Sequence, residues 1–353
     1  MLQRSIAPAL LILTVSAGGL AAQADTSSPG HTPTHYDITL VRSDSGPHVL
    51  AEVETSWRLG SALPVVVDLD SSFRVIRVFV DGKPDTRLSR TQFARGTGDV
   101  LIPHEKPSGD TLTTRIRYHG VPRGGLRAGP NQYGARTLVA EGMSADPALW
   151  LPVPEPDRRT ASITFHIQGD SGERVIAAGV LAKVDTLAYG HTRWDYQLDQ
   201  TIPLSAIALA AGPYATDSLP RTDCAKPCAR VSVWTWSRDS SFAIGGPFRR
   251  AAGMVDYFSR LLGAFPYPAL THVEAPVEKV VSGASVILYP ESSFRTGTLD
   301  EAAVARATSR QWLQPGAPDS VAEYLARLWR ADADGKAKKS PDLARVRGFL
   351  RSQ

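Results

Sequence analysis

Alternating apolar and polar residues dominate the chain up to about residue 214. Tyr36, Ile38 and Leu40 alternate with polar neighbours, and residues 49–57 and 112–118 repeat the pattern. A period of two predicts strands that bury one face. Further short strands are predicted at 65–69, 78–80, 163–167, 175–181, 194–198 and 202–211. Many short strands punctuated by Gly and Pro predict a β-sandwich-like domain.

The pattern changes after this point to a mixture of strands and helices. Pro247 is expected to open an amphipathic helix that Gly263 closes. The segment Thr298-Leu299-Asp300-Glu301 has the form of a capping box, which predicts a helix from there to about Leu313. Strands are predicted at 231–234, 271–275 and 285–289, a helix capped by Asp319 or Ser320, and a last basic helix at 341–351. The overall prediction is therefore a β domain followed by an α/β region.

The N-terminal segment has the three parts of a secretory signal peptide. A positive head at residues 1–4 precedes an apolar run, and Ala22-Gln23-Ala24 gives a small-residue cleavage pattern. The apolar run is too short to span a bilayer and contains Pro8. We therefore predict a signal peptide over 1–24, a flexible lead-in over 25–34, and an exported protein, periplasmic or extracellular, with no integral membrane segment after cleavage.

Composition narrows the functional classes. The chain has 353 residues, 42% of them hydrophobic and 21% charged, which is ordinary for a globular protein with room for two cores. The formal net charge of +4 is spread along the chain without a basic block. This gives no indication of nucleic-acid binding.

The two cysteines, Cys224 and Cys228, bracket a short turn that contains Pro227. In an oxidising compartment this spacing predicts a small local disulfide. A zinc site would need two more ligands, and no histidine lies nearby in the sequence.

Four segments, in order and spacing, resemble the M1 family of zinc aminopeptidases. They are Tyr133–Val153, Ala208–Tyr214, Leu262–Pro268 and Ala284–Glu291. The resemblance runs from about residue 33 to 330. It implies an N-terminal β-sandwich-like M1 domain over 35–218, followed by a truncated, thermolysin-like mixed α+β lobe over 219–353.

The residues that hold zinc in the family are absent from the matching positions. The family's V-A-H-E-x-x-H-Q-W motif corresponds to residues 304–312, where Arg306 and Arg310 replace both histidines and Ala307 replaces the general base. A protonated guanidinium has no free lone pair for a metal. No H-E-x-x-H occurs anywhere in the sequence.

Other family positions differ as well. Asp319 stands where the third ligand, a glutamate, is expected, and Ser282 stands at the glutamate of the G-x-M-E-N motif that binds the substrate's amino group. The resemblance also implies that the sequence stops before the family's catalytic tyrosine and helical C-terminal domain. We therefore expect no M1-type catalysis and no cofactor; zinc would be expected only if the family activity were retained.

Arg306 and Arg310 lie one helical turn apart, on one face. One hypothesis is that they replace the charge of the metal and pair with Asp319 or hold a ligand carboxylate. The alternative is that this helix has drifted and both arginines are solvated.

Three functional interpretations remain open on the sequence. The favoured one is a catalytically inactive, exported M1 aminopeptidase-like protein that binds peptides or another exported protein. The second is a zinc metallo-aminopeptidase with unorthodox ligands that removes N-terminal residues from peptides. The third is a truncated relic without function.

Overall fold

The computed structural model describes residues 30–44, 46–85, 97–142, 145–154, 159–220, 228–313 and 317–335. The predicted signal peptide, the last basic helix and Cys224 lie outside these residues, so all three, and the predicted disulfide to Cys228, stay predictions. Within the described part of the chain, no helix is long and apolar enough to cross a membrane.

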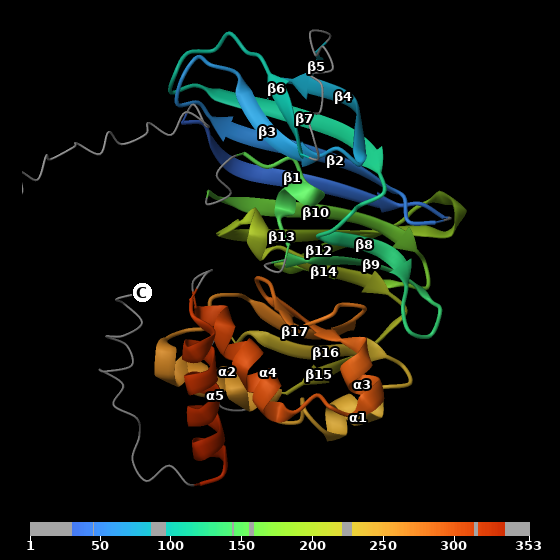
Figure 1. Cartoon of the computed structure of the whole chain (residues 1–353), viewed down its shortest axis with the longest axis vertical. Helices are drawn as coiled ribbons and strands as arrows, with labels where there is room; N and C mark the ends of the chain where they lie inside the picture. Colours follow the sequence, from blue (N-terminus) through green and yellow to red (C-terminus); the bar gives the residue numbers. More distant parts are fainter. Residues whose placement is uncertain are drawn as a thin grey trace, which may run out of the picture.

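A mixed eight-stranded sheet, in the order β12-β13-β10-β1-β2-β7-β4-β5, forms the upper layer of the molecule (Figure 1). Its strands are β1 (Thr32–Arg42), β2 (Val49–Arg58), β4 (Phe73–Val80), β5 (Lys83–Pro84), β7 (Thr111–Gly120), β10 (Thr160–Asp170), β12 (Val180–Thr186) and β13 (His191–Pro203). Only β1 and β10 pair in parallel within this sheet. The predicted alternation is confirmed, since Tyr36, Ile38 and Leu40 are buried.

Two smaller sheets complete the β domain. One pairs β3 (Val65–Asp70) with β6 (Thr97–Ile102), and the other has the order β11-β14-β9-β8. The strands of the latter are β8 (Leu126–Pro130), β9 (Arg136–Glu141), β11 (Arg174–Ala177) and β14 (Ala208–Gly212). Short 3-10 helices occur at Pro147–Leu149 (η2), Ala188–Gly190 (η3) and Leu204–Ala206 (η4).

Two predicted strands are interrupted. The strand expected at 175–181 is two strands in different sheets, because the chain turns at Gly179, which has a φ of 104°. A Cβ there would lie 2.2 Å from the carbonyl oxygen of Gln197, so only glycine fits this turn. The strand expected at 202–211 is broken by η4, which separates the end of β13 from β14.

The second part of the molecule is a five-stranded sheet with helices on one face. The strand order is β15-β16-β17-β19-β18, with β16, β17 and β19 parallel. The strands are β15 (Tyr214–Leu219), β16 (Arg230–Trp236), β17 (Ala269–Ala275), β18 (Val281–Ser282) and β19 (Val286–Pro290). Since β15 already belongs to this sheet, its strands begin at Tyr214, shortly before the predicted boundary at 218.

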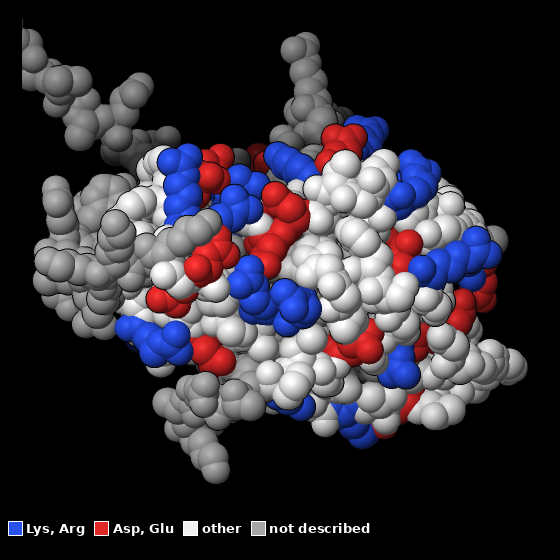
Figure 2. All heavy atoms as spheres, turned by 90° about the horizontal axis from the view of Figure 1, so that it is seen from below, with Lys and Arg blue, Asp and Glu red and all other residues white. Residues whose placement is uncertain are grey.

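This sheet is covered on both faces, which explains its apolar strands. Side chains such as Val273 and Leu288 join the core of the β domain, whereas Leu270 and Ile287 join the core beneath the helices. The helices are α1 (Ser240–Gly245), α2 (Ala251–Leu262), α3 (Glu291–Thr296), α4 (Glu301–Ser309) and α5 (Asp319–Ala333). Figure 1 shows the sheet between the β domain above and these helices below. Figure 2 shows the molecule from below, with basic and acidic side chains interspersed on that face. The predicted class, a β domain followed by a mixed α/β lobe, is confirmed.

Helix boundaries differ from the prediction in three places. The first long helix starts at Ala251, after a turn that contains Pro247. The capping box is wrong, because the carboxylate of Asp300, and not Thr298, accepts from the backbone N–H of Ala303. Helix α4 ends at Ser309 and continues as the 3-10 helix η5 (Arg310–Trp312), while Asp319 lies in the first turn of α5, after Pro318.

Candidate functional site

The structure brings the five positions that the M1 resemblance singles out to one cavity of about 430 Å³. Its walls come from β18 and the residue before it, from α4 and η5, and from the first turns of α5. The lining residues are Val280, Ser282, Ala303, Arg306, Ala307, Arg310, Asp319, Ser320 and Glu323. The five positions, which were singled out from the sequence, therefore lie close together in space.

Both arginines of the cavity are paired with carboxylates on α5. Nη1 of Arg306 lies 2.8 Å from Oε2 of Glu323, and Nη2 of Arg310 contacts Oδ1 of Asp319. The pairing with Asp319 is the one that the charge-replacement hypothesis expected, and Glu323 adds a second pair that it did not include. The arginines are therefore part of an ion-pair network that joins two helices.

Electrostatics within the cavity follow from these pairs. Burial, together with the nearby charge of Arg306, lowers the pKa of Arg310 from its ordinary value. Hydrogen bonding from Arg306 lowers the pKa of Glu323. Each guanidinium thus lies beside a carboxylate of α5, and the formal charges of the two pairs cancel across the cavity.

These residues do not fit a zinc ion. Guanidinium groups occupy the two positions from which imidazoles would bind, and their positive charge repels a dication. Ala307 has no group that could polarise a bound water. No histidine lines the cavity.

The arrangement of the cavity is fixed by Gln311 in η5. Its Oε1 accepts from the backbone N–H of Ser285 at 3.0 Å, and its Nε2 donates to the carbonyl of Gly283 at 3.0 Å. Gln311 is buried, so both bonds are formed away from water. They tie the helix that carries the arginines to the loop between β18 and β19.

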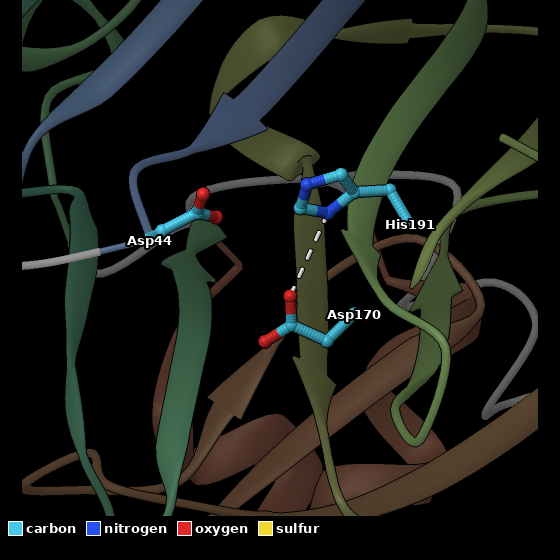
Figure 3. A group of neighbouring side chains, drawn as sticks. All are labelled: Asp44, Asp170 and His191. Atoms are coloured by element: carbon cyan, nitrogen blue, oxygen red, sulfur yellow. Dashed lines mark ion pairs between the residues drawn. The ribbon is translucent and has the colours of Figure 1, made fainter. Parts of the chain in front are cut away.

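A possible metal-binding group lies in the β domain instead. Ligand atoms of Asp44, Asp170 and His191 all lie within 4.8 Å of one another, and it is the one such group found among the described residues (Figure 3). Nδ1 of His191 is 3.6 Å from Oδ1 of Asp170. The other oxygen of Asp170 pairs with Arg42 at 3.1 Å and with Arg136 at 3.4 Å, so a cation here would meet two guanidinium groups.

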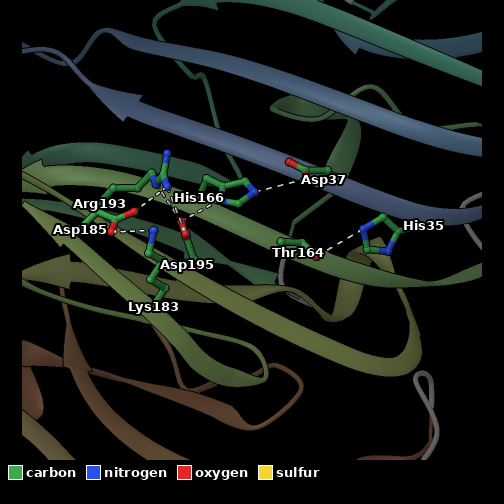
Figure 4. A network of polar contacts seen from close by, with 8 residues as sticks. All are labelled: His35, Asp37, Thr164, His166, Lys183, Asp185, Arg193 and Asp195. Carbon is green, nitrogen blue, oxygen red and sulfur yellow. Dashed lines mark hydrogen bonds and ion pairs between the residues drawn. The ribbon is translucent and has the colours of Figure 1, made fainter. Parts of the chain in front are cut away.

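Another polar network covers the face of the large sheet over four neighbouring strands (Figure 4). His166 lies between two aspartates, with Nδ1 2.7 Å from Asp195 and Nε2 3.3 Å from Asp37. Arg193 bonds to Asp185 and Asp195, so the chain of charges continues to the edge strand. Each charge has a partner, and the network is best explained as cross-strand stabilisation.

The buried carboxylate of Glu274 was missed by sequence reasoning. It is fully buried at the C-terminal end of β17 and accepts from the backbone N–H of Trp236 at 3.0 Å and from Nε2 of Gln132 at 3.1 Å. Burial, and secondarily the hydrogen bond and charge of Asp239 and the charge of Glu291, raise its pKa to about 10. A carboxylic acid is therefore held protonated at the junction of the β domain and the lobe.

Comparison with known proteins identifies the fold. No protein-family model and no curated protein sequence matches the chain. An M1 zinc metallopeptidase from Deinococcus radiodurans is similar in structure, with a TM-score of 0.70 and 18% identity over 87% of this chain and 72% of that chain. A two-domain M1 zinc metallopeptidase, an alanine mutant bound to L-tryptophan, has a TM-score of 0.70 and 19% identity over 88% of this chain and 73% of that chain. The chain therefore has the fold of M1 zinc metallopeptidases.

Proposed function

We propose that this protein is a catalytically inactive, exported relative of the M1 peptidases that binds peptides or another exported protein. The observation that carries the proposal is the cavity in which Arg306 and Arg310 stand at the ligand positions and pair with Asp319 and Glu323. These residues cannot bind zinc, so no hydroxide for peptide hydrolysis can be generated at this place.

The same cavity has features of a peptide site. It borders β18, an edge strand of the lobe's sheet, which among the described residues pairs with β19 alone. An extended peptide adds to such an edge through its main-chain groups. Val280 and the two alanines give the cavity an apolar wall, and Val280 is 37% exposed. The ion pairs opposite offer partners for a charged side chain or terminus.

Metal content and turnover test the absence of catalysis. The purified protein, incubated with zinc and then dialysed, is expected to hold far less than one zinc per chain and to release no product from aminoacyl-arylamides. One tightly held zinc per chain with chelator-sensitive turnover would contradict the proposal. It would instead establish a zinc aminopeptidase with unorthodox ligands.

Peptide binding tests the second half of the proposal. Short peptides are titrated against the wild type and against Arg306→Glu/Arg310→Glu, which places four carboxylates in one cavity. We expect lower thermal stability and at least roughly tenfold weaker peptide binding, because both ion pairs become repulsive. The control is Arg330→Glu, since Arg330 is exposed on α5 and is not among the residues that line the cavity. Unchanged stability and binding in the double variant would show that the arginines have no such role.

A further inference from the structure

A second cavity, of about 460 Å³, lies in the β domain at one end of the large sheet. Its lining residues lie on, or directly beside, the ends of three neighbouring strands, β2, β7 and β4. The polar side chains that line it are His48, Ser72, Arg74, His119 and Arg123. It belongs to neither the altered peptidase site nor the Asp44 group.

Strand register explains why these residues meet. His119 on β7 is paired with Arg74 on β4 and, on its other side, with Leu50 on β2. Directly paired residues point to the same face of a sheet, and His48 precedes Leu50 by two positions. The two imidazoles and the guanidinium of Arg74 therefore project from one face at the same end of the sheet.

Gly120 lets the ends of two neighbouring strands come close together. A Cβ at this position would lie 2.3 Å from the carbonyl oxygen of Ser72, so glycine permits the end of β7 to touch the turn before β4. The contact places Ser72 at the cavity, and Arg123 follows from the segment after β7. Three separate segments of the chain, at residue 48, at 72–74 and at 119–123, thus converge on one space.

Most of the basic groups of the cavity have no counter-charge. No carboxylate is among its described lining residues. Among the described residues, the side chains of His48, Arg74 and His119 have no ion pair and no hydrogen bond. Arg123 lies at 4.0 Å from Asp70, which is buried and already accepts from the backbone N–H of Ser72. The hydroxyl of Ser72 is itself buried without a partner.

We propose that this cavity binds a phosphate group, free or as a phosphomonoester. Clustered cationic groups repel one another unless an anion neutralises them. Arginine forks suit the oxygens of phosphate, and the two imidazoles add donors from other directions. A tetrahedral oxyanion has enough acceptor oxygens for donors from all of these elements, whereas a carboxylate has two. The site is independent of the peptide cavity.

Titration of the whole chain with inorganic phosphate tests the proposal, with the imidazole resonances of His48 and His119 as the signal. We expect both histidines to shift together with phosphate, and acetate at equal concentration to bind more weakly. Arg74→Glu is expected to weaken phosphate binding by at least roughly tenfold, because an attractive charge becomes a repulsive one. Arg74 is exposed, so the variant is expected to melt like the wild type.

Arg58→Glu is the matched control. Arg58 is exposed on β2 at the opposite end of the same strands, where it pairs with Thr111. This variant should bind phosphate as the wild type does. If both variants bound phosphate equally weakly, the effect would come from the net charge of the protein and not from this cavity, which would contradict the proposal. The absence of any histidine shift in the wild type at millimolar phosphate would overturn it as well. Glycerol 3-phosphate and vesicles that contain phosphatidic acid, both phosphomonoesters, are titrated in the same way and show whether a small molecule or a lipid headgroup carries the phosphate.

Discussion

Glu274 shows how one buried side chain can set the pH dependence of stability. Its carboxyl is enclosed with Asp239 and Glu291 nearby, and its pKa is about 10 in the folded protein. An unfolded chain would ionise the same group near pH 4.5. The folded state therefore binds one more proton than the unfolded state over the interval between these values, and this group's contribution to stability falls as the pH rises through it.

Substitution of Glu274 by Gln is expected to stabilise the protein at neutral and alkaline pH. The amide mimics the protonated acid and needs no proton from solvent. For a single group, the free energy of unfolding of the wild type loses up to about 1.4 kcal/mol per pH unit relative to the variant. Denaturant unfolding of both proteins at several pH values measures this difference.

Glu54→Gln provides the control for this substitution. The side chain of Glu54 is 45% exposed on β2, so its removal should leave the pH dependence unchanged. A constant difference in stability between Glu274→Gln and the wild type from pH 5 to 9 would mean that Glu274 is ionised in the folded protein.

Sequence patterns predicted the residues of the altered site but not Glu274, and the reason is physical. Arg306, Ala307 and Arg310 stand on one short helix, where spacing fixes which residues share a face. Asp319 follows shortly after them. Glu274, in contrast, lies in an apolar strand. Its polar environment is formed with Gln132 and Asp239, which the fold brings from two other segments of the chain.

At the scale of single elements, helix α4 depends on a cap that the sequence pattern misplaced. Two candidates, Thr298 and Asp300, precede the helix, and the pattern favoured the first because Glu301 follows it at the right spacing. In the structure Thr298 bonds to the hydroxyl of Thr296, and Asp300 caps the helix with a 2.8 Å bond to Ala303. Local patterns find a helix start but do not choose between adjacent caps.

Asp300→Ala is therefore expected to destabilise the protein by about 1 kcal/mol, the typical cost of removing an N-cap side chain. The backbone N–H of Ala303 loses its acceptor, and the negative charge at the helix N-terminus is lost as well. Thr298→Ala is the comparison and should cost clearly less. Chemical denaturation of the two variants measures both losses of stability. A larger loss for Thr298→Ala than for Asp300→Ala would show that Thr298 caps the helix, as the capping-box pattern predicts.

At the scale of the whole molecule, the lobe and the β domain share a continuous core. Val273 and Leu288 of the lobe's sheet pack with the β domain, and the opposite face packs with the helices. The strand pattern predicted this layered class, but not the positions of Gly179 and η4, where tertiary contacts redirect the chain. Because the core fixes α4 and α5 relative to each other, the geometry of the cavity can persist although the ligands of a metal are gone.

This persistence predicts that zinc binding can be restored. The variant Arg306→His/Ala307→Glu/Arg310→His/Asp319→Glu places two imidazoles one turn apart and a carboxylate opposite them, the donor set of a catalytic zinc site. Removing both guanidinium groups also removes the charge that repels a dication. We expect the variant to hold one zinc per chain after dialysis and the wild type to hold none.

The control for this experiment is a histidine pair on another helix. Asp256→His/Arg260→His on α2 creates the same one-turn spacing outside the cavity. Two histidines on any helix bind zinc weakly, so only tighter binding by the four-residue variant, measured by chelator competition, reports on the cavity. If both variants bound zinc with the same affinity, α5 would not approach α4 as the contact between Arg310 and Asp319 requires, and the altered positions would not form one site.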